Sequence, residues 1–138
     1  MYVVLDSSVI VGALVESEEK HFKCKSILEQ AKNGKFIAIE PYSVLVEVTA
    51  AIKRRTGSED LAERIMKDLQ NIDSIHFLEL VAFRAIRAAE ICKQTALRGM
   101  DAIVVQAADE FDATLVSLDE EMLDRSRKIV KIKSVDDF

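Results

Sequence analysis

The stretch Tyr2-Val-Val-Leu-Asp-Ser-Ser8 decides the fold, because it joins an apolar run to one acid and two small polar residues. Its first four residues are aromatic, β-branched or aliphatic, with no alternating polar residue. That pattern predicts a strand buried on both faces, as in a parallel sheet. Asp6, Ser7 and Ser8 end the strand with residues that cap helices, so a short helix is expected over residues 9–15.

The same alternation of short apolar runs and longer helical patterns continues along the chain. Further strands are predicted at residues 36–39, 75–78, 114–117 and 129–132. Helices are predicted at residues 20–33, 41–55, 58–72, 82–97 and 100–110, with a helical turn after Asp119. In the helix at 82–97, the expected buried stripe consists of Ala85, Ile86, Ala89 and Cys92.

Strands that alternate with helices indicate a parallel sheet covered by helices on both faces. The predicted fold class is therefore α/β, with three layers (α/β/α) and a central parallel sheet of four to five strands. The 138 residues suit a single domain spanning residues 1–138.

The composition describes an ordinary globular protein, with 49% hydrophobic and 31% charged residues. The net charge of −5 argues against a nucleic-acid partner, unless the acids are clustered on cations. Neutralising four of them would change −5 to about −1. Cys24 and Cys92 lack metal-type spacing, which favours a reducing compartment. The apolar start lacks a basic leader and is too short for a membrane span, so a cytoplasmic protein without membrane contact is expected.

Two acids follow predicted strands and are candidates for chemistry. Asp6 comes directly after residues 2–5, and Asp119 comes shortly after residues 114–117. Because the carboxyl ends of parallel strands meet at one edge of a sheet, both acids are expected there. The simpler alternative is that each one caps the helix that follows it.

Two further acids lie in apolar helices. Glu47 is the only charged residue between Pro41 and Ile52. A helix that is apolar around most of its circumference is expected to be largely buried, and a lone buried carboxylate needs a partner or a cation. A narrow solvent-facing stripe is the alternative for Glu47. Asp101 begins another apolar helix, where a first-turn acid can also serve the helix dipole.

Together these segments resemble the PIN-domain nucleases, especially the VapC-type toxins of toxin–antitoxin pairs, over essentially the whole chain. The resemblance rests on Val3-Val-Leu-Asp-Ser-Ser-Val-Ile10, Ser43-Val-Leu-Val-Glu-Val48, Met100-Asp-Ala-Ile103 and Leu115-Val-Ser-Leu-Asp119. It implies a PIN-like domain whose acidic, catalytic and metal-binding site consists of Asp6, Glu47, Asp101 and Asp119. It also implies that Ser117 supports the site. Ser8 stands where the family often has Asn, which is a departure in the residues around the acids.

An all-carboxylate site suits Mg²⁺ or Mn²⁺, which prefer oxygen ligands. Since His21 and His76 lie outside the motifs, zinc is not expected. The chemistry would be hydrolysis of a phosphodiester by cation-activated water, and the resemblance points to RNA as the substrate. Bases near the acids are candidates for substrate binding, namely Arg54, Arg55 and Arg98.

Two other functions remain open at this point. A Mg²⁺-dependent phosphatase also places an acid after its first strand, although Asp6-Ser7-Ser8 lacks a second acid two residues on. A catalytically weak PIN-like module that binds RNA or acts as a scaffold is the other. The resemblance further implies a small antitoxin protein as partner and a homodimer, for which the apolar helices at 41–52 and 82–97 could supply the interface.

Overall fold

The computed structural model describes all residues from 1 to 138 and contains one five-stranded sheet. The strands are β1 (Tyr2–Leu5), β2 (Ile37–Pro41), β3 (Ile75–Leu78), β4 (Thr114–Ser117) and β5 (Lys131–Ser134). They lie in the order β3-β2-β1-β4-β5, and every neighbouring pair is parallel. The predicted α/β fold with a parallel sheet is confirmed.

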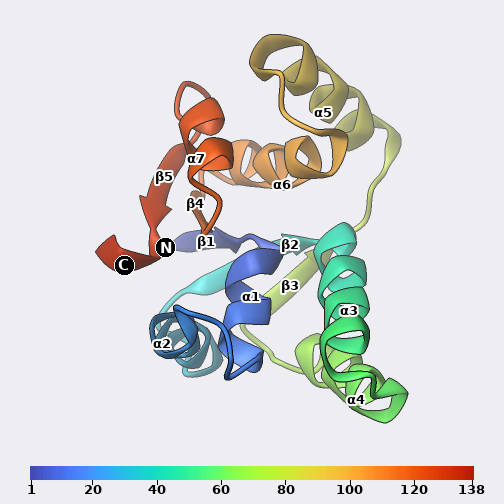
Figure 1. Ribbon diagram of the computed structural model, residues 1–138. Helices are drawn as coiled ribbons and strands as arrows, with labels where there is room; N and C mark the ends of the chain where they lie inside the picture. The colour runs from blue at the N-terminus through green and yellow to red at the C-terminus, as the bar shows by residue number, and fades with distance from the viewer.

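Helices cover both faces of the sheet (Figure 1). They are α1 (Ser7–Leu14), α2 (His21–Lys32), α3 (Tyr42–Thr56), α4 (Glu59–Gln70), α5 (Ala82–Thr95), α6 (Gly99–Glu110) and α7 (Glu120–Ser126), followed by a 3₁₀ turn, η1 (Val135–Asp137). Helices α1 to α4 lie on one face, and α5, α6 and α7 lie on the other (Figure 1). Crossovers between parallel strands are right-handed as a rule, so a chain that reverses its direction across the sheet, as this one does after β3, places its later helices on the opposite face. None of the helices has the length and apolar character needed to cross a bilayer.

The reversal creates a switch point between β1 and β4. From β1 the chain moves outward through β2 to β3, and it then returns to the other side of β1 to form β4 and β5. In open parallel sheets, ligands bind at the carboxyl ends of the strands that flank such a point. Asp6 follows β1 and Asp119 follows β4, so both acids lie beside the crevice.

The central strands form the middle of the core. Val3, Val4, Leu5 and Leu115 are completely buried, which agrees with the unbroken apolar runs of β1 and β4. The surrounding helices close this core on both faces. Strands β1 and β4, which precede Asp6 and Asp119, are therefore held firmly in the core.

The last strand begins two residues later than predicted. The sequence favoured residues 129–132, but the amides of Ile129 and Val130 both donate to the carbonyl of Ser126 and lie in the preceding turn. The strand itself is Lys131–Ser134 at the edge of the sheet. An edge strand alternates charged and apolar residues, so the most apolar four-residue segment does not mark where this strand begins.

The predicted buried stripe of α5 is also wrong. Ala85, Ile86 and Ala89 are exposed, whereas Ala88 and Ile91 are buried. The helix packs beside α6, where two ion pairs fix its orientation: Arg84 with Glu110, and Arg87 with Asp109. These contacts with another helix decide which face is turned inward, and the pattern within α5 does not reveal them.

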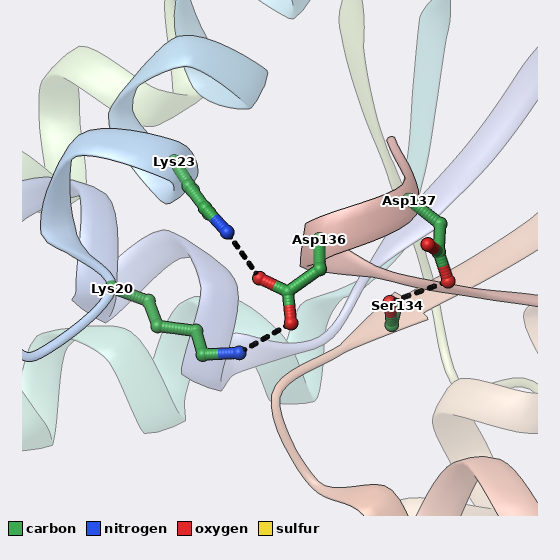
Figure 2. A network of polar contacts seen from close by, with 5 residues as sticks. All are labelled: Lys20, Lys23, Ser134, Asp136 and Asp137. Carbon is green, nitrogen blue, oxygen red and sulfur yellow. Dashed lines mark hydrogen bonds and ion pairs between the residues drawn. The ribbon is translucent and has the colours of Figure 1, made fainter.

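Two lysines attach the C-terminal turn to α2 (Figure 2). Lys20 Nζ and Lys23 Nζ donate to the two carboxylate oxygens of Asp136, at 2.7 and 2.6 Å. Beside them, the Ser134 hydroxyl donates to Asp137 at 2.9 Å (Figure 2). The hydrogen bonds from Lys20 and Lys23 lower the pKa of Asp136 from 3.8 to about 2.

Substituting Asp136 with Asn is expected to lower the melting temperature at pH 7 by no more than a few degrees, since the pair is solvent-exposed and screened. A carboxyl group with a lowered pKa stabilises the fold above its ordinary value of 3.8, and loses that effect as the pH falls toward about 2. Thermal melts of both proteins at several pH values measure this. A difference that persists below pH 2 would contradict the assignment to charge.

Candidate active site

Asp6 occupies the N-cap position of α1, but its side chain does not cap the helix. Instead its Oδ2 accepts hydrogen bonds from the hydroxyls of Ser8 at 2.7 Å and Ser117 at 2.9 Å. The residue is only 7% exposed. The simple capping explanation is therefore wrong for the Asp6 side chain, which is held by serines from two different segments.

The same serines connect the ends of β1 and β4. The Ser117 hydroxyl accepts the amide hydrogen of Asp119 at 2.9 Å, and the Ser8 hydroxyl accepts that of Leu118 at 3.2 Å. Each serine thus donates to Asp6 and accepts from the segment after β4. The two acids that follow these strands are fixed relative to each other.

Asp119 is the N-cap of α7, as the alternative reading expected. Its Oδ1 accepts from the amide of Met122 at 3.1 Å. This hydrogen bond uses one carboxylate oxygen and leaves Oδ2 for another ligand. Capping and a role in the site are compatible for Asp119.

Glu47 lies near the middle of α3, whose surface is less buried than the sequence suggested. Val46 is 66% exposed and Tyr42 is 43% exposed, so an apolar strip of this helix faces outward. Glu47 itself is partly buried. Burial raises the pKa of the Glu47 carboxyl group, and the negative charges of Asp6 and Asp101 raise it further. The carboxylate therefore faces the other acids and not the bulk solvent alone.

Asp101 is in the first turn of α6. Burial, followed by the charges of Asp6 and Asp119, raises its pKa, while the nearby Arg98 lowers it. A first-turn acid also complements the helix dipole, so both readings of this residue hold. Glu47, Asp101 and Asp119 line one cavity, and the charge of Asp6 acts on both Glu47 and Asp101.

A small cavity of about 80 Å³ is lined by Asp101 and Asp119 together with Arg98 and Arg125. Two larger cavities also adjoin this acidic cluster, defined as Asp6, Glu47, Asp101 and Asp119. The larger, of about 690 Å³, combines acids, one base and an apolar wall from α5 and α6. Its lining includes Glu47, Arg98, Asp101, Asp119, Ala88, Cys92 and Ile103. The smaller, of about 370 Å³, lies between α1 and α3 and shares the Glu47 side chain.

The three candidate bases differ in their surroundings. Arg98 lines the larger cavity together with the acids. Arg54 and Arg55 line the smaller cavity, where Arg55 forms an ion pair with Glu18. Arg98 is therefore the candidate base that shares a cavity with three of the acids and acts on the charge of Asp101, whereas Arg55 has a carboxylate partner of its own.

The donor set of the cluster consists of carboxylate and hydroxyl oxygens, which suits Mg²⁺ or Mn²⁺. The two histidines lie elsewhere, with ring nitrogens on the carbonyls of Gly12 and Asp73. In this structure no three Asp, Glu, His or Cys side chains converge closely enough to hold a metal ion between them. Mg²⁺ commonly takes one or two carboxylates and completes its shell with water and substrate phosphate, so an open acidic site fits this cation.

Substituting Glu47 with Gln is expected to raise the melting temperature of the metal-free protein by a few degrees at neutral pH. A carboxyl group whose pKa is raised above 4.5 by folding holds its proton longer when folded, so stability falls as the pH rises through that window. Above the window the repulsion is fully present, and the amide removes it. Thermal melts in chelator between pH 4 and 8 measure the effect, and a difference independent of pH would contradict it.

Glu40 is an acid of this region that the sequence reasoning missed. It is the last residue but one of β2, is completely buried, and accepts the amide hydrogen of Leu5 at 2.7 Å through its Oε1. The sequence does contain a pattern that could have identified Glu40. Glu40 follows the apolar run Phe36-Ile-Ala-Ile39 just as Asp6 follows its own apolar strand.

With this geometry established, comparison with known proteins identifies the family. The family model for the PIN domain matches residues 3–128 of the sequence. The chain belongs to the PIN domain family. No curated protein sequence matches this PIN domain.

Solved structures share its fold at low sequence identity. VapC20 of Mycobacterium tuberculosis, described as a sarcin-ricin loop cleaving toxin, superposes with a TM-score of 0.74 at 14% identity, covering 87% of this chain and 92% of that one. FitAcB of Neisseria gonorrhoeae superposes with a TM-score of 0.73 at 12% sequence identity, and the match covers 100% of both chains. DNA-bound VapBC of Salmonella typhimurium superposes with a TM-score of 0.72 at 12% sequence identity, and the match covers 98% of both chains. At these identities the likeness establishes the fold of this PIN domain, and the expected PIN-like architecture is confirmed.

Proposed function

We propose that this PIN domain is a ribonuclease that uses Mg²⁺ or Mn²⁺ to hydrolyse phosphodiester bonds at the acidic cluster. One observation carries the proposal. Glu47, Asp101 and Asp119, from three separate segments, line one cavity, and burial followed by neighbouring acidic charges, that of Asp6 among them, raises the pKa of Glu47 and of Asp101. Such crowding destabilises a protein unless a cation neutralises it, so a cation site is the natural use of this arrangement.

Each residue of the cluster has a distinct part in this proposal. The two serine hydroxyls orient the Asp6 carboxylate by donating hydrogen bonds to its Oδ2. Asp119 offers Oδ2 while Oδ1 caps α7. Glu47, whose pKa is raised and which borders both cavities, is suited to accept a proton from the attacking water. Arg98 faces the same cavity and is suited to bind the phosphate.

The bound cation would neutralise charge on the scissile phosphate and lower the pKa of a water molecule. One or two carboxylates among Asp6, Asp101 and Asp119 would hold it beside the crevice between β1 and β4, with water and substrate phosphate completing its shell. Since α1, α6 and α7 begin at this crevice, their amide dipoles also favour negative charge there. These helix N-termini would partly offset the negative charge that the acids and the substrate phosphate bring together.

We further propose that the protein is the toxin of a toxin–antitoxin pair and acts on RNA in the cytoplasm. Similar folds occur in VapC20, described as a toxin that cleaves the sarcin-ricin loop, and in VapBC. A small antitoxin protein is the expected partner. Co-expression with the product of an adjacent small gene tests this, and cleavage unaffected by any such product would count against the pairing.

A homodimer is the proposed assembly. Large apolar side chains remain exposed close together in sequence where β3 leads into α5, namely Leu80, Val81, Phe83 and Ile86. Contiguous exposed apolar surface marks an interaction site, and self-association covers it. Sedimentation analysis of the wild type and of Ile86→Lys tests this. A dimer that the substitution dissociates is expected, and a wild type that is monomeric at high micromolar concentration would contradict it.

Activity assays separate the main proposal from its alternatives. Purified protein is incubated with single-stranded RNA, structured RNA and a small phosphomonoester, in Mg²⁺, Mn²⁺ or chelator. RNA cleavage that requires metal supports the ribonuclease. Phosphomonoester hydrolysis without RNA cleavage would favour the phosphatase, and RNA binding without cleavage under all conditions would favour the binding module.

A further inference from the structure

Glu40 is a completely buried acid at the carboxyl end of β2, outside the acidic cluster. On one side it pairs with Phe77 of β3 in the regular ladder. On the other side, its carboxyl group faces β1. A buried carboxyl group is costly unless it makes a compensating interaction, so its position calls for an explanation.

The interaction occurs where β1 and β2 part. The residue pairs of the β1–β2 ladder end at Val3 with Ala38, whereas β1 continues to pair with β4 as far as Leu5. At Leu5, the amide hydrogen is donated to Glu40 Oε1 at 2.7 Å. A side-chain oxygen therefore occupies the place of a backbone carbonyl at the end of this strand.

This hydrogen bond lies one residue before Asp6. On the opposite edge of β1, the Asp6 amide donates to the carbonyl of Val116 at 2.9 Å. The peptide that joins Leu5 to Asp6 is thus held from β2 and from β4. The two serines fix the Asp6 carboxylate, and Glu40 fixes the backbone from which it projects.

The surroundings of the second oxygen of Glu40 disfavour the charged form of its carboxyl group. Oε2 is buried and has no hydrogen-bond partner. Burial raises the pKa of Glu40 well above 4.5, against the effect of the Leu5 hydrogen bond, and the charge of Asp6 raises it further. A neutral acid supplies an acceptor beneath the acidic cluster without adding another negative charge.

We propose that Glu40 is a positioning residue of the nuclease site, whose carboxyl oxygen holds the end of β1 and so sets the direction in which Asp6 enters the acidic cluster. This inference rests on the proposed function. It assigns Glu40 no contact with substrate or cation. A residue that merely fills the core could be replaced by any side chain of equal volume, whereas this role requires an acceptor at the right distance.

Three variants of the full-length protein test the role. Glu40→Gln keeps the shape, the neutral charge and the acceptor. Glu40→Met keeps the volume but removes the acceptor, and Glu40→Asp keeps the acid but withdraws its oxygen by one methylene. Ile39→Ala, at a buried neighbour in β2, is the control for lost stability alone. Mn²⁺ affinity is measured by calorimetry without RNA, well below each melting temperature, and kcat and KM are measured on RNA.

Glu40→Gln and Ile39→Ala are expected to bind Mn²⁺ within about twofold of the wild type. Glu40→Met and Glu40→Asp are expected to lose about tenfold or more in Mn²⁺ affinity and in kcat, with KM for RNA changed less, as for other residues that orient metal ligands. If Glu40→Met does not fold, Glu40→Asp carries the test. Wild-type affinity and kcat in the folded acceptor-deficient variants would overturn the positioning role alone. A wild type that binds no Mn²⁺ would overturn the proposed function and this inference with it.

Discussion

Substituting Asp6 with Asn is expected to slow RNA cleavage by about a thousandfold or more at saturating Mg²⁺. Cation-based stabilisation of the transition state supplies several kcal/mol, and each 1.36 kcal/mol is about tenfold in rate. Asn has the size of Asp but lacks its charge, so the hydrogen bonds from Ser8 and Ser117 lose their charged acceptor. Asp101→Asn is expected to have a comparable effect, and single-turnover cleavage of a labelled RNA measures both.

Asp68→Asn is the matched control, because it makes the same chemical change at an exposed position of α4. It is expected to cleave at the wild-type rate. Activity shared equally by all preparations would identify a contaminating ribonuclease. Undiminished cleavage by pure Asp6→Asn and Asp101→Asn proteins, with distinct products from those of contaminants, would contradict the acidic-site mechanism.

Millimolar Mn²⁺ is expected to raise the melting temperature of the wild-type protein by roughly 10 °C. A ligand at about one hundred times its dissociation constant adds about 2.7 kcal/mol to stability, and a domain of this size gains roughly 3–5 °C per kcal/mol. The cation also removes the repulsion that raises the pKa values of Glu47 and Asp101. Thermal melts with Mn²⁺, Mg²⁺ and chelator measure the shift.

The same melts contain their own controls. Asp101→Asn is expected to lose most of the Mn²⁺ shift, while Asp68→Asn retains it. A wild type whose melting temperature does not change across millimolar Mn²⁺ and Mg²⁺ would contradict a cation site in the folded protein. A shift of equal size in Asp101→Asn would move that site away from the acidic cluster.

The parts of the fold that depend on burial could be predicted from the sequence. Strands β1 and β4 are central and covered on both faces, so their unbroken apolar runs identified them. Edge strand β5 carries no such run, and its start was misplaced by two residues. The inward face of α5 depends on its ion pairs with α6, which are contacts between distant residues that no local pattern records.

In the candidate site, too, the features set by strand order could be predicted, and those set by tertiary contacts could not. Asp6 and Asp119 could be predicted to meet, because strand order alone brings them to one edge of the sheet. The hydrogen bonds that orient Asp6 could not, since they depend on hydroxyl positions set by tertiary packing. Glu40 follows an apolar run as Asp6 does, but the run alone does not distinguish an acid that enters the cluster from one that holds a neighbouring strand.

The most direct test of the acidic cluster is an anomalous difference map from crystals of the wild-type protein grown or soaked with Mn²⁺. A peak is expected within coordination distance of carboxylate oxygens among Asp6, Glu47, Asp101 and Asp119, beside the crevice between β1 and β4. No peak there at saturating Mn²⁺, or peaks only at other acids, would contradict the central claim.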